Sequence, residues 1–205
     1  MDAASLKKAM QTISNVMTEQ KEYLIELDQK NGDGDLGISM SDGFKAASDA
    51  LGQSEESDLG RLFLKASAAF NEAAPSSLGT ILSLGMMGMA KMLKGKTEVE
   101  LAGFAEAMKA GIGRIMEKAG SKPGEKTILD ALCPAVDALF ANSDDKEKAF
   151  HAAAQAAAKG SESTREMRSV HGRAAYYGDK SIGVLDGGSV VGKLLFEAIE
   201  QSHCR

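Results

Sequence analysis

Residues 6–37, LKKAMQTISNVMTEQKEYLIELDQKNGDGDLG, contain the pattern on which the fold prediction rests. Apolar side chains recur every three or four residues along the first two thirds of this stretch, at Leu6, Met10, Ile13, Met17, Leu24 and Leu27. That spacing places them on one face of an α-helix. The last ten residues contain three aspartates separated by glycines, which is typical of a tight polar turn. The stretch therefore predicts an amphipathic helix that ends in an acidic turn.

The same helical spacing recurs through the rest of the chain, and no segment alternates with the two-residue period of a strand. Further helices are expected at about 40–51, 59–70, 77–93, 101–115 and 128–140, from residue 150 onward, and at 191–199. Short connections favour antiparallel neighbours. We therefore predict an all-α fold, an up-and-down bundle of about eight helices. Without a low-complexity linker or an internal repeat, residues 1–205 are expected to form a single domain.

Four polar breaker segments interrupt these helices, at about 28–39, 74–77, 120–127 and 172–188. In an up-and-down bundle, alternate loops lie at the same end. These four segments are therefore expected to converge and to form a ligand site at one end of the bundle.

Composition excludes several classes of protein. A net charge of -5 argues against a nucleic-acid-binding protein, which needs a basic face. No apolar stretch approaches the roughly 20 residues that span a bilayer, and the first ten residues do not resemble a signal peptide. We expect a cytoplasmic protein without membrane or nucleic-acid partners. Because Trp is absent, its core should be built from Ala, Leu, Ile, Val and the 11 Met.

The acidic turn carries the strongest chemical signal. Asp28, Asp33 and Asp35 supply three carboxylates within eight residues. Hard oxygen ligands at this density suit magnesium or calcium, whereas zinc prefers His or Cys. The alternative without a ligand is a solvated helix-capping turn, because aspartates are common at helix starts.

A calcium-binding EF-hand is a second alternative, since Asn31, Asp33 and Asp35 fit the first, third and fifth positions of such a loop. However, Leu36 stands where that loop needs glycine, and Asp42 replaces its final bidentate glutamate. The sequence therefore favours another kind of metal site.

Three other segments carry weaker signals. Ser76 and Ser77 precede a predicted helix, whose free N–H groups could bind phosphate, although a serine there is also a plain N-cap. Arg173 lies in a long glycine-bearing loop and could bind phosphate, although a lone loop arginine is more often a surface residue. His171 is either a loop residue or an acid–base group.

Asp28 with the sequence Asp33-Gly34-Asp35-Leu36-Gly37 resembles the aspartate loop of the L subunit of dihydroxyacetone kinase. The resemblance implies that Asp28, Asp33 and Asp35 hold two Mg²⁺ ions. This family commonly has His and Asn where the present chain has Leu36 and Ser39.

Three later segments match the family in the same order. They are 75–80, 122–130 and 172–188, the last of which contains Gly172-Arg173-Ala174 and Ser181-Ile182-Gly183. The family typically has proline at the position of Gly187. By resemblance, Ile128 packs on the adenine and Arg173 contacts phosphates. The nucleotide-binding residues implied are Leu36, Gly37, Ile38, Ser39, Ser76, Ser77, Gly120, Ile128, Arg173, Asp186, Gly187 and Gly188.

The resemblance implies an eight-helix antiparallel barrel that binds ADP or ATP at one end. Its expected activity is phosphoryl transfer to dihydroxyacetone, held on a separate K subunit, without a catalytic residue on this chain. Because the sequence contains no K-like domain, we favour the phosphotransferase-system form, in which a phosphohistidine M subunit recharges the bound ADP. An ATP-dependent kinase for another small ketose and a non-catalytic regulatory paralogue remain alternatives. A homodimer also stays open.

Overall fold

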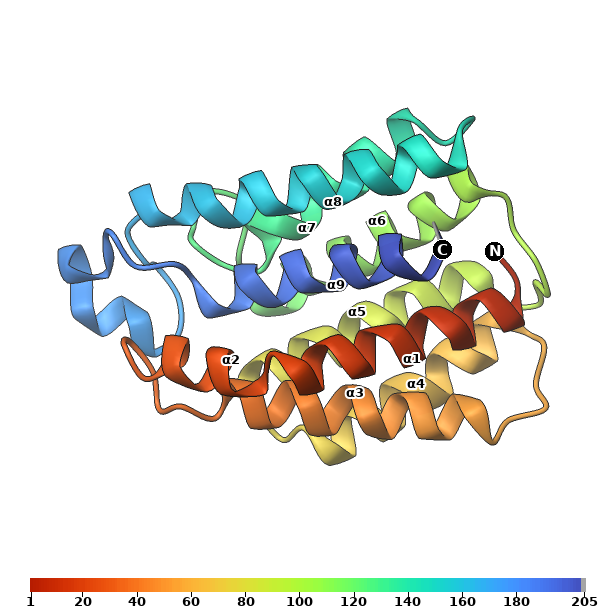
Figure 1. The fold of residues 1–205 in the computed structure, drawn as a ribbon, viewed down its shortest axis with the longest axis horizontal. Helices are drawn as coiled ribbons and strands as arrows, with labels where there is room; N and C mark the ends of the chain where they lie inside the picture. Colours follow the sequence, from red (N-terminus) through yellow and green to blue (C-terminus); the bar gives the residue numbers. More distant parts are fainter. Residues whose placement is uncertain (204–205) are drawn as a thin grey trace.

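The computed structural model describes residues 1–203, and nine α-helices account for most of that range (Figure 1). Two 3-10 helices, η1 (Thr164–Glu166) and η2 (Arg173–Ser181), lie between the last two of them. The α-helices are α1 (Ala3–Glu19), α2 (Lys21–Asp28), α3 (Leu36–Gly52), α4 (Leu59–Ala73), α5 (Ser77–Leu93), α6 (Leu101–Ala119), α7 (Leu129–Ala141), α8 (Lys146–Ser163) and α9 (Gly187–His203). The predicted all-α class is confirmed.

The first predicted helix is divided in two. Its axis bends at Gln20, where the backbone takes φ -92° and ψ 6°, and α2 begins at the next residue. All six apolar residues of the predicted face are nevertheless buried. The bend lets α2 pack on the start of α3, where a side chain at Gly37 would overlap the Lys21 carbonyl oxygen. Eight helices were expected, and the ninth comes from this bend.

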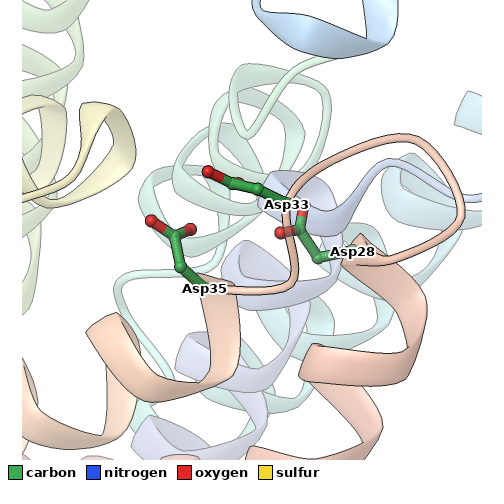
Figure 2. Close-up of side chains that lie close together, drawn as sticks. All are labelled: Asp28, Asp33 and Asp35. Carbon is green, nitrogen blue, oxygen red and sulfur yellow. The ribbon is translucent and has the colours of Figure 1, made fainter.

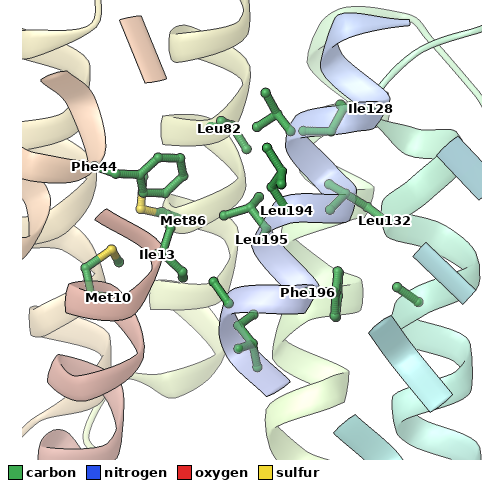
Figure 3. Close-up of a cluster of buried hydrophobic side chains, with 14 of the residues drawn as sticks. Met10, Ile13, Phe44, Leu82, Met86, Ile128, Leu132, Leu194, Leu195 and Phe196 are labelled. Carbon is green, nitrogen blue, oxygen red and sulfur yellow. The ribbon is translucent and has the colours of Figure 1, made fainter. Parts of the chain in front are cut away.

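The helices form a closed antiparallel ring. Each helix from α3 to α9 packs on the next, and α1 packs on both α3 and α9, with α2 as an extension of α1 (Figure 1). Counting α1 and α2 together gives the expected eight-membered barrel. The apolar faces meet inside it, where Met10, Phe44, Met86, Leu132 and Leu195 come from five different helices (Figure 3). An apolar cavity of about 140 Å³ lies among them.

Acidic and hydroxyl side chains cap the N-terminal ends of several helices. Asp2, Asp58, Ser76 and Asp145 each accept a hydrogen bond from a backbone N–H in the first turn of α1, α4, α5 and α8. Each such cap contributes about 1 kcal/mol to helix stability, because it satisfies a donor that has no intrahelical partner. The sequence thus sets where these helices begin.

The alternation of helices brings four connections to one end of the barrel. The α2–α3, α4–α5, α6–α7 and α8–α9 connections all lie on the left in Figure 1. The predicted convergence is confirmed for the segments near 28–39, 74–77, 120–127 and 172–188. Among residues 1–203, no helix is both long and apolar enough to cross a membrane.

The α5–α6 contact gives a test of this packing. A Cβ added at Gly111 would lie 2.7 Å from the Gly85 carbonyl oxygen, whereas a Cβ at Gly113 meets nothing within 4 Å. We expect Gly111→Ala to destabilise the protein by about 1–2 kcal/mol, because overpacking outweighs the better helix propensity of alanine. Gly113→Ala, two residues away, should stabilise it by up to about 1 kcal/mol. Urea denaturation checks both, and equal effects would contradict the packing described.

Candidate functional site

The acidic turn holds its three aspartates in different ways. Asp28 ends α2, and its Oδ2 accepts a hydrogen bond from the Gly34 N–H at 2.8 Å. Gly34 has φ +80°, which glycine adopts without strain. Asp35 is the residue before α3, but its side chain makes no capping hydrogen bond. The capping alternative therefore fails for Asp35, whose carboxylate is available to a ligand.

The three carboxylates lie close together. One oxygen from each of Asp28, Asp33 and Asp35 lies within 4.8 Å of the others (Figure 2). The ligands of an octahedral Mg²⁺ lie about 3–4 Å apart, given metal–oxygen distances near 2.1 Å. Asp33 and Asp35 are exposed, so small side-chain rotations suffice to bring the oxygens together around an ion. An all-oxygen, anionic donor set of this size fits a magnesium ion.

Burial and the neighbouring carboxylates make ionisation of Asp35 unfavourable. Burial raises the pKa of Asp35, the negative charges of Asp33 and Asp28 raise it further, and the Arg173 guanidinium opposes them. A raised pKa means that ionised Asp35 is disfavoured in the protein by itself. A divalent cation reverses that preference, because it stabilises all three charges at once.

Arg173 joins the acidic turn to the α8–α9 connection. Its guanidinium Nη2 lies 2.7 Å from Asp33 Oδ2, although the arginine side chain is 67% exposed. An exposed ion pair of this kind is weak, about 0–1 kcal/mol, so the arginine can exchange partners. Arg173, Tyr176 and Tyr177 face Asn31 and Gly32 across a hollow of about 500 Å³. The site is therefore open to solvent on one side, and the Arg173 guanidinium lies at the edge of this opening.

The start of α5 contributes a serine cap. Ser76 Oγ accepts a hydrogen bond from the Gly79 N–H at 3.1 Å, which is the plain capping role weighed from the sequence. Ser77 is the first residue of α5. The Ser76 N–H donates to the Ala74 carbonyl oxygen at 2.7 Å, so the Ser77 and Leu78 N–H groups are the donors that this helix start, with its dipole, offers to an anion.

The other side of the site is built from the α6–α7 turn and the start of α9. Gly120 ends α6 in the left-handed conformation, with φ 62°. Ile128 is buried, and a Cβ at Gly188 would lie 3.4 Å from its backbone nitrogen. Asp186 Oδ2 accepts a hydrogen bond from the Ser189 N–H at 2.6 Å and so caps α9. The predicted contacts Ile128, Asp186 and Gly188 thus lie together.

Two departures from the family pattern touch each other. A Cβ at Gly187 would lie 2.6 Å from Leu36 Cδ2. The leucine methyl group therefore occupies space that a larger residue at position 187 needs. Leu36 and Ser39 are buried in α3, whereas Ile38 between them is exposed. Leu36 and Gly187 therefore pack directly against each other.

Sequence reasoning missed the contacts that organise the α6–α7 turn. Asp130 is buried, and its carboxylate accepts hydrogen bonds from the N–H groups of Gly124 at 2.5 Å and Thr127 at 2.7 Å. His171 Nε2 lies 2.6 Å from Glu125 Oε2, so it links this turn to the segment that carries Arg173. The spacing of three residues between Thr127 and Asp130 is a sequence signal for the hydrogen bond between them. No local pattern indicates the His171–Glu125 contact, because 46 residues separate the partners.

Comparisons with known proteins identify the family. A family model described as the DAK2 domain matches residues 30–201. The chain is 32% identical over 185 residues to "PEP-dependent dihydroxyacetone kinase 1, ADP-binding subunit DhaL" of Listeria innocua, which covers 90% of this chain and 89% of that protein. It is 28% identical over 206 residues to L-erythrulose 1-kinase of Mycolicibacterium smegmatis, covering 99% of this chain but 36% of that protein.

Two solved structures share the fold. The native dihydroxyacetone kinase of C. freundii superposes with a TM-score of 0.80 at 21% identity, covering 99% of this chain and 35% of that chain. Its complex with AMP-PNP and Mg²⁺ gives 0.78 at 22% identity, with 98% and 34% covered. The fold, the span of the family match and the similarity to the Listeria protein agree: this chain belongs to the DAK2 domain family, as a member of the DhaL type.

Proposed function

We propose that this chain, as a single DhaL-like domain over residues 1–205, is the nucleotide-binding subunit of a dihydroxyacetone kinase. It holds ADP or ATP with two Mg²⁺ ions while a phosphoryl group passes to dihydroxyacetone on a separate K subunit. The observation that carries the proposal is the clustering of Asp28, Asp33 and Asp35 within 4.8 Å at the end of the barrel that also bears Arg173. The name of the Listeria relative and the Mg²⁺–AMP-PNP complex of the C. freundii kinase support it.

The side of the site that contains the acidic turn, the start of α5 and Arg173 is assigned to the diphosphate. Asp28, Asp33 and Asp35 hold the metal ions, which neutralise the phosphate charge when bound. Ser76 and Ser77 contact phosphate oxygens at the start of α5, through their hydroxyl groups and the Ser77 N–H. Arg173 leaves Asp33 once a metal ion occupies that carboxylate, and it then turns its fork of donors to the phosphates.

The side of the site built from the α6–α7 turn and the start of α9 is assigned to the adenosine. Ile128 and Gly120 flank the base, and Asp186 with Gly187 and Gly188 approaches the adenosine from the start of α9. The remaining predicted contacts are at the start of α3, which follows the metal ligands directly in the chain: Leu36, Gly37, Ile38 and Ser39. The base and the phosphates are thereby positioned from opposite sides of one opening.

No residue of this chain acts as a general base in the proposal. Phosphoryl transfer depends mostly on positioning and on neutralising charge, which the carboxylates, the helix start and the arginine supply. His171 is engaged with Glu125. The acceptor hydroxyl is left to the K subunit.

We further propose the phosphoenolpyruvate-dependent form, in which an M subunit with a phosphohistidine recharges bound ADP. The support is that the Listeria protein so named matches along 89% of its own length. An ATP-dependent kinase for another ketose is the second candidate, favoured by the match of 99% of this chain to L-erythrulose 1-kinase. A non-catalytic regulatory role is a third, favoured by the packing of Leu36 against Gly187, two positions at which the family resemblance implies other residues.

A reconstituted assay separates these candidates. Purified chain is mixed with a dihydroxyacetone-loaded K subunit and either ATP or a phosphohistidine M subunit with catalytic ADP, and triose phosphate is measured. We expect turnover with the M subunit. Turnover with ATP alone and erythrulose supports the second candidate, whereas Mg²⁺–ADP binding without any turnover supports the regulatory one.

Asp33→Asn tests the metal site. The substitution removes one anionic ligand, so we expect Mg²⁺-dependent ADP affinity to fall by a factor of about 100 or more, with unchanged helix content. Calorimetry with and without Mg²⁺ measures the affinity. Asp42→Asn is the matched control, since Asp42 is an exposed acid on α3 and is the final ligand of the EF-hand alternative. Equal losses in both variants would overturn the assignment.

Asp186→Asn tests the charge state at the start of α9. Burial raises the pKa of Asp186 to about 7, nearby Asp130 adds to this, and the Ser189 N–H and Lys126 oppose it. The pKa of Asp186 is about 7 in the folded protein and near 4 in the unfolded chain. Its contribution to the free energy of unfolding is therefore fully present below about pH 4 and is lost as the pH rises through about 7. Asparagine keeps the cap without the charge.

In urea denaturation without ligands, Asp186→Asn should therefore match the wild type near pH 4.5. At pH 8 it should be more stable by about 2 kcal/mol, less than the full shift implies because water screens a partly exposed group. A stability difference that does not change with pH contradicts this account.

A further inference from the structure

Lys126 has an unusual place in the α6–α7 turn. Its side chain is 3% exposed, and its backbone φ is 61°, the one left-handed residue other than glycine in residues 1–203. This conformation costs a residue with a Cβ about 1–2 kcal/mol, which glycine would avoid. The buried side chain must therefore provide a compensating interaction.

That interaction is a complete set of hydrogen bonds from the ammonium group. Lys126 Nζ donates to the carbonyl oxygens of Met167 at 3.1 Å, Ser181 at 2.6 Å and Val184 at 2.7 Å. An ammonium has three donors, so all of them are used. Bonds from a charged donor are stronger than neutral ones.

The charge of Lys126 faces these carbonyl dipoles. Burial lowers its pKa, the charge of Asp186 raises it, and Arg165 lowers it again. Burying an ammonium is costly unless its hydrogen bonds are all satisfied. The three carbonyl oxygens meet that condition, and they do so only while the backbone at 167, 181 and 184 stays in place around the ammonium.

The three carbonyl groups belong to one segment, residues 165–184, which contains η2 and Arg173. Within this segment only Ser169 and Ser181 are buried. Four of its larger apolar side chains are exposed, those of Val170, Tyr176, Tyr177 and Ile182, and the other two, Met167 and Val184, are only partly buried. Hydrophobic packing therefore contributes little to its position, and polar contacts decide where it lies.

Few of those polar contacts reach outside the segment toward the site. Its internal bonds include the Gly183 N–H to the Arg165 carbonyl oxygen at 2.7 Å and the Ser169 N–H to Ser181 Oγ at 2.9 Å. The exposed Arg173–Asp33 pair and the His171–Glu125 pair link it to the rest of the site. The Lys126 ammonium is the buried link and makes three bonds where each of these makes one.

We propose that Lys126 is a positioning residue, whose ammonium fixes residues 165–184 on the α6–α7 turn and thereby holds Arg173 at the phosphate side of the nucleotide site. The part concerning the nucleotide rests on the proposed function. The anchoring part does not, because it concerns only this chain. Lys126 acts through backbone carbonyl groups, and Arg173 makes the contact with the ligand.

Limited trypsin digestion tests the anchor without any ligand. Residues 165–184 contain four exposed cleavage sites, Arg165, Arg168, Arg173 and Lys180. Lys126→Met keeps the apolar stem and removes the ammonium, so cleavage within the segment should become about tenfold faster or more. Lys122→Met, an exposed lysine in the same turn, is the matched control and should leave the rate unchanged. A rate for Lys126→Met equal to the wild type overturns the proposal.

Calorimetry with Mg²⁺–ADP tests the link to Arg173. Lys126→Met should bind about tenfold more weakly than the wild type, and Arg173→Ala should also bind more weakly. The double variant should bind as weakly as Arg173→Ala alone, because Lys126 acts through that arginine. If the two losses of affinity multiply in the double variant, Lys126 acts independently of Arg173, and the positioning role is contradicted. A wild type that does not bind Mg²⁺–ADP refutes the proposed function, while the trypsin result still decides the anchor.

Chemical rescue separates the ammonium from general loss of packing. Lys126→Ala leaves space for propylammonium, which should restore resistance to trypsin in that variant and leave the wild type unchanged. N-propylacetamide, which is uncharged, should not restore resistance to trypsin. Lys126→Gln is the second neutral variant if Lys126→Met does not fold. If neither neutral variant folds, the ammonium supports the whole barrel, and the specific role proposed here is wrong.

Discussion

The contact between α1 and α9 closes the ring of helices, and the position of the site depends on that closure. An even number of antiparallel helices around a closed core places every second connection at the same end. The four polar connections are the ones that share an end, and the apolar faces between them fill the interior (Figures 1 and 3). The barrel thus works as a rigid frame that holds four loops from distant parts of the sequence against one another.

Electrostatics decides what those loops can hold. Three carboxylates lie close enough that burial and mutual repulsion raise the pKa of Asp35. Two of the cationic side chains at the same end of the barrel, Arg173 and Lys126, differ in kind. Arg173 is exposed and paired with a single carboxylate, so it can change partners. Lys126 is buried with every donor used, so it cannot move without breaking three hydrogen bonds.

The departures from the family pattern also have a physical basis. Leu36 follows the acidic turn directly, where the resemblance implies a polar residue, and its methyl group fills the space next to Gly187. A glycine at position 187 therefore fits the leucine at position 36, although 150 residues lie between them in the sequence. The three carboxylates of Asp28, Asp33 and Asp35 lie within 4.8 Å of one another beside this contact.

The sequence by itself determined the helices, because the spacing of apolar residues and the caps at Asp58, Ser76 and Asp145 are local properties. It also determined the acidic turn, since three carboxylates within eight residues need no distant partner to be recognised. Only the tertiary structure decided the bend at Gln20, the His171–Glu125 pair and the burial of Lys126. Each of these depends on contacts between residues far apart in the sequence, which form only when the ring of helices closes. No local sequence pattern predicts such contacts.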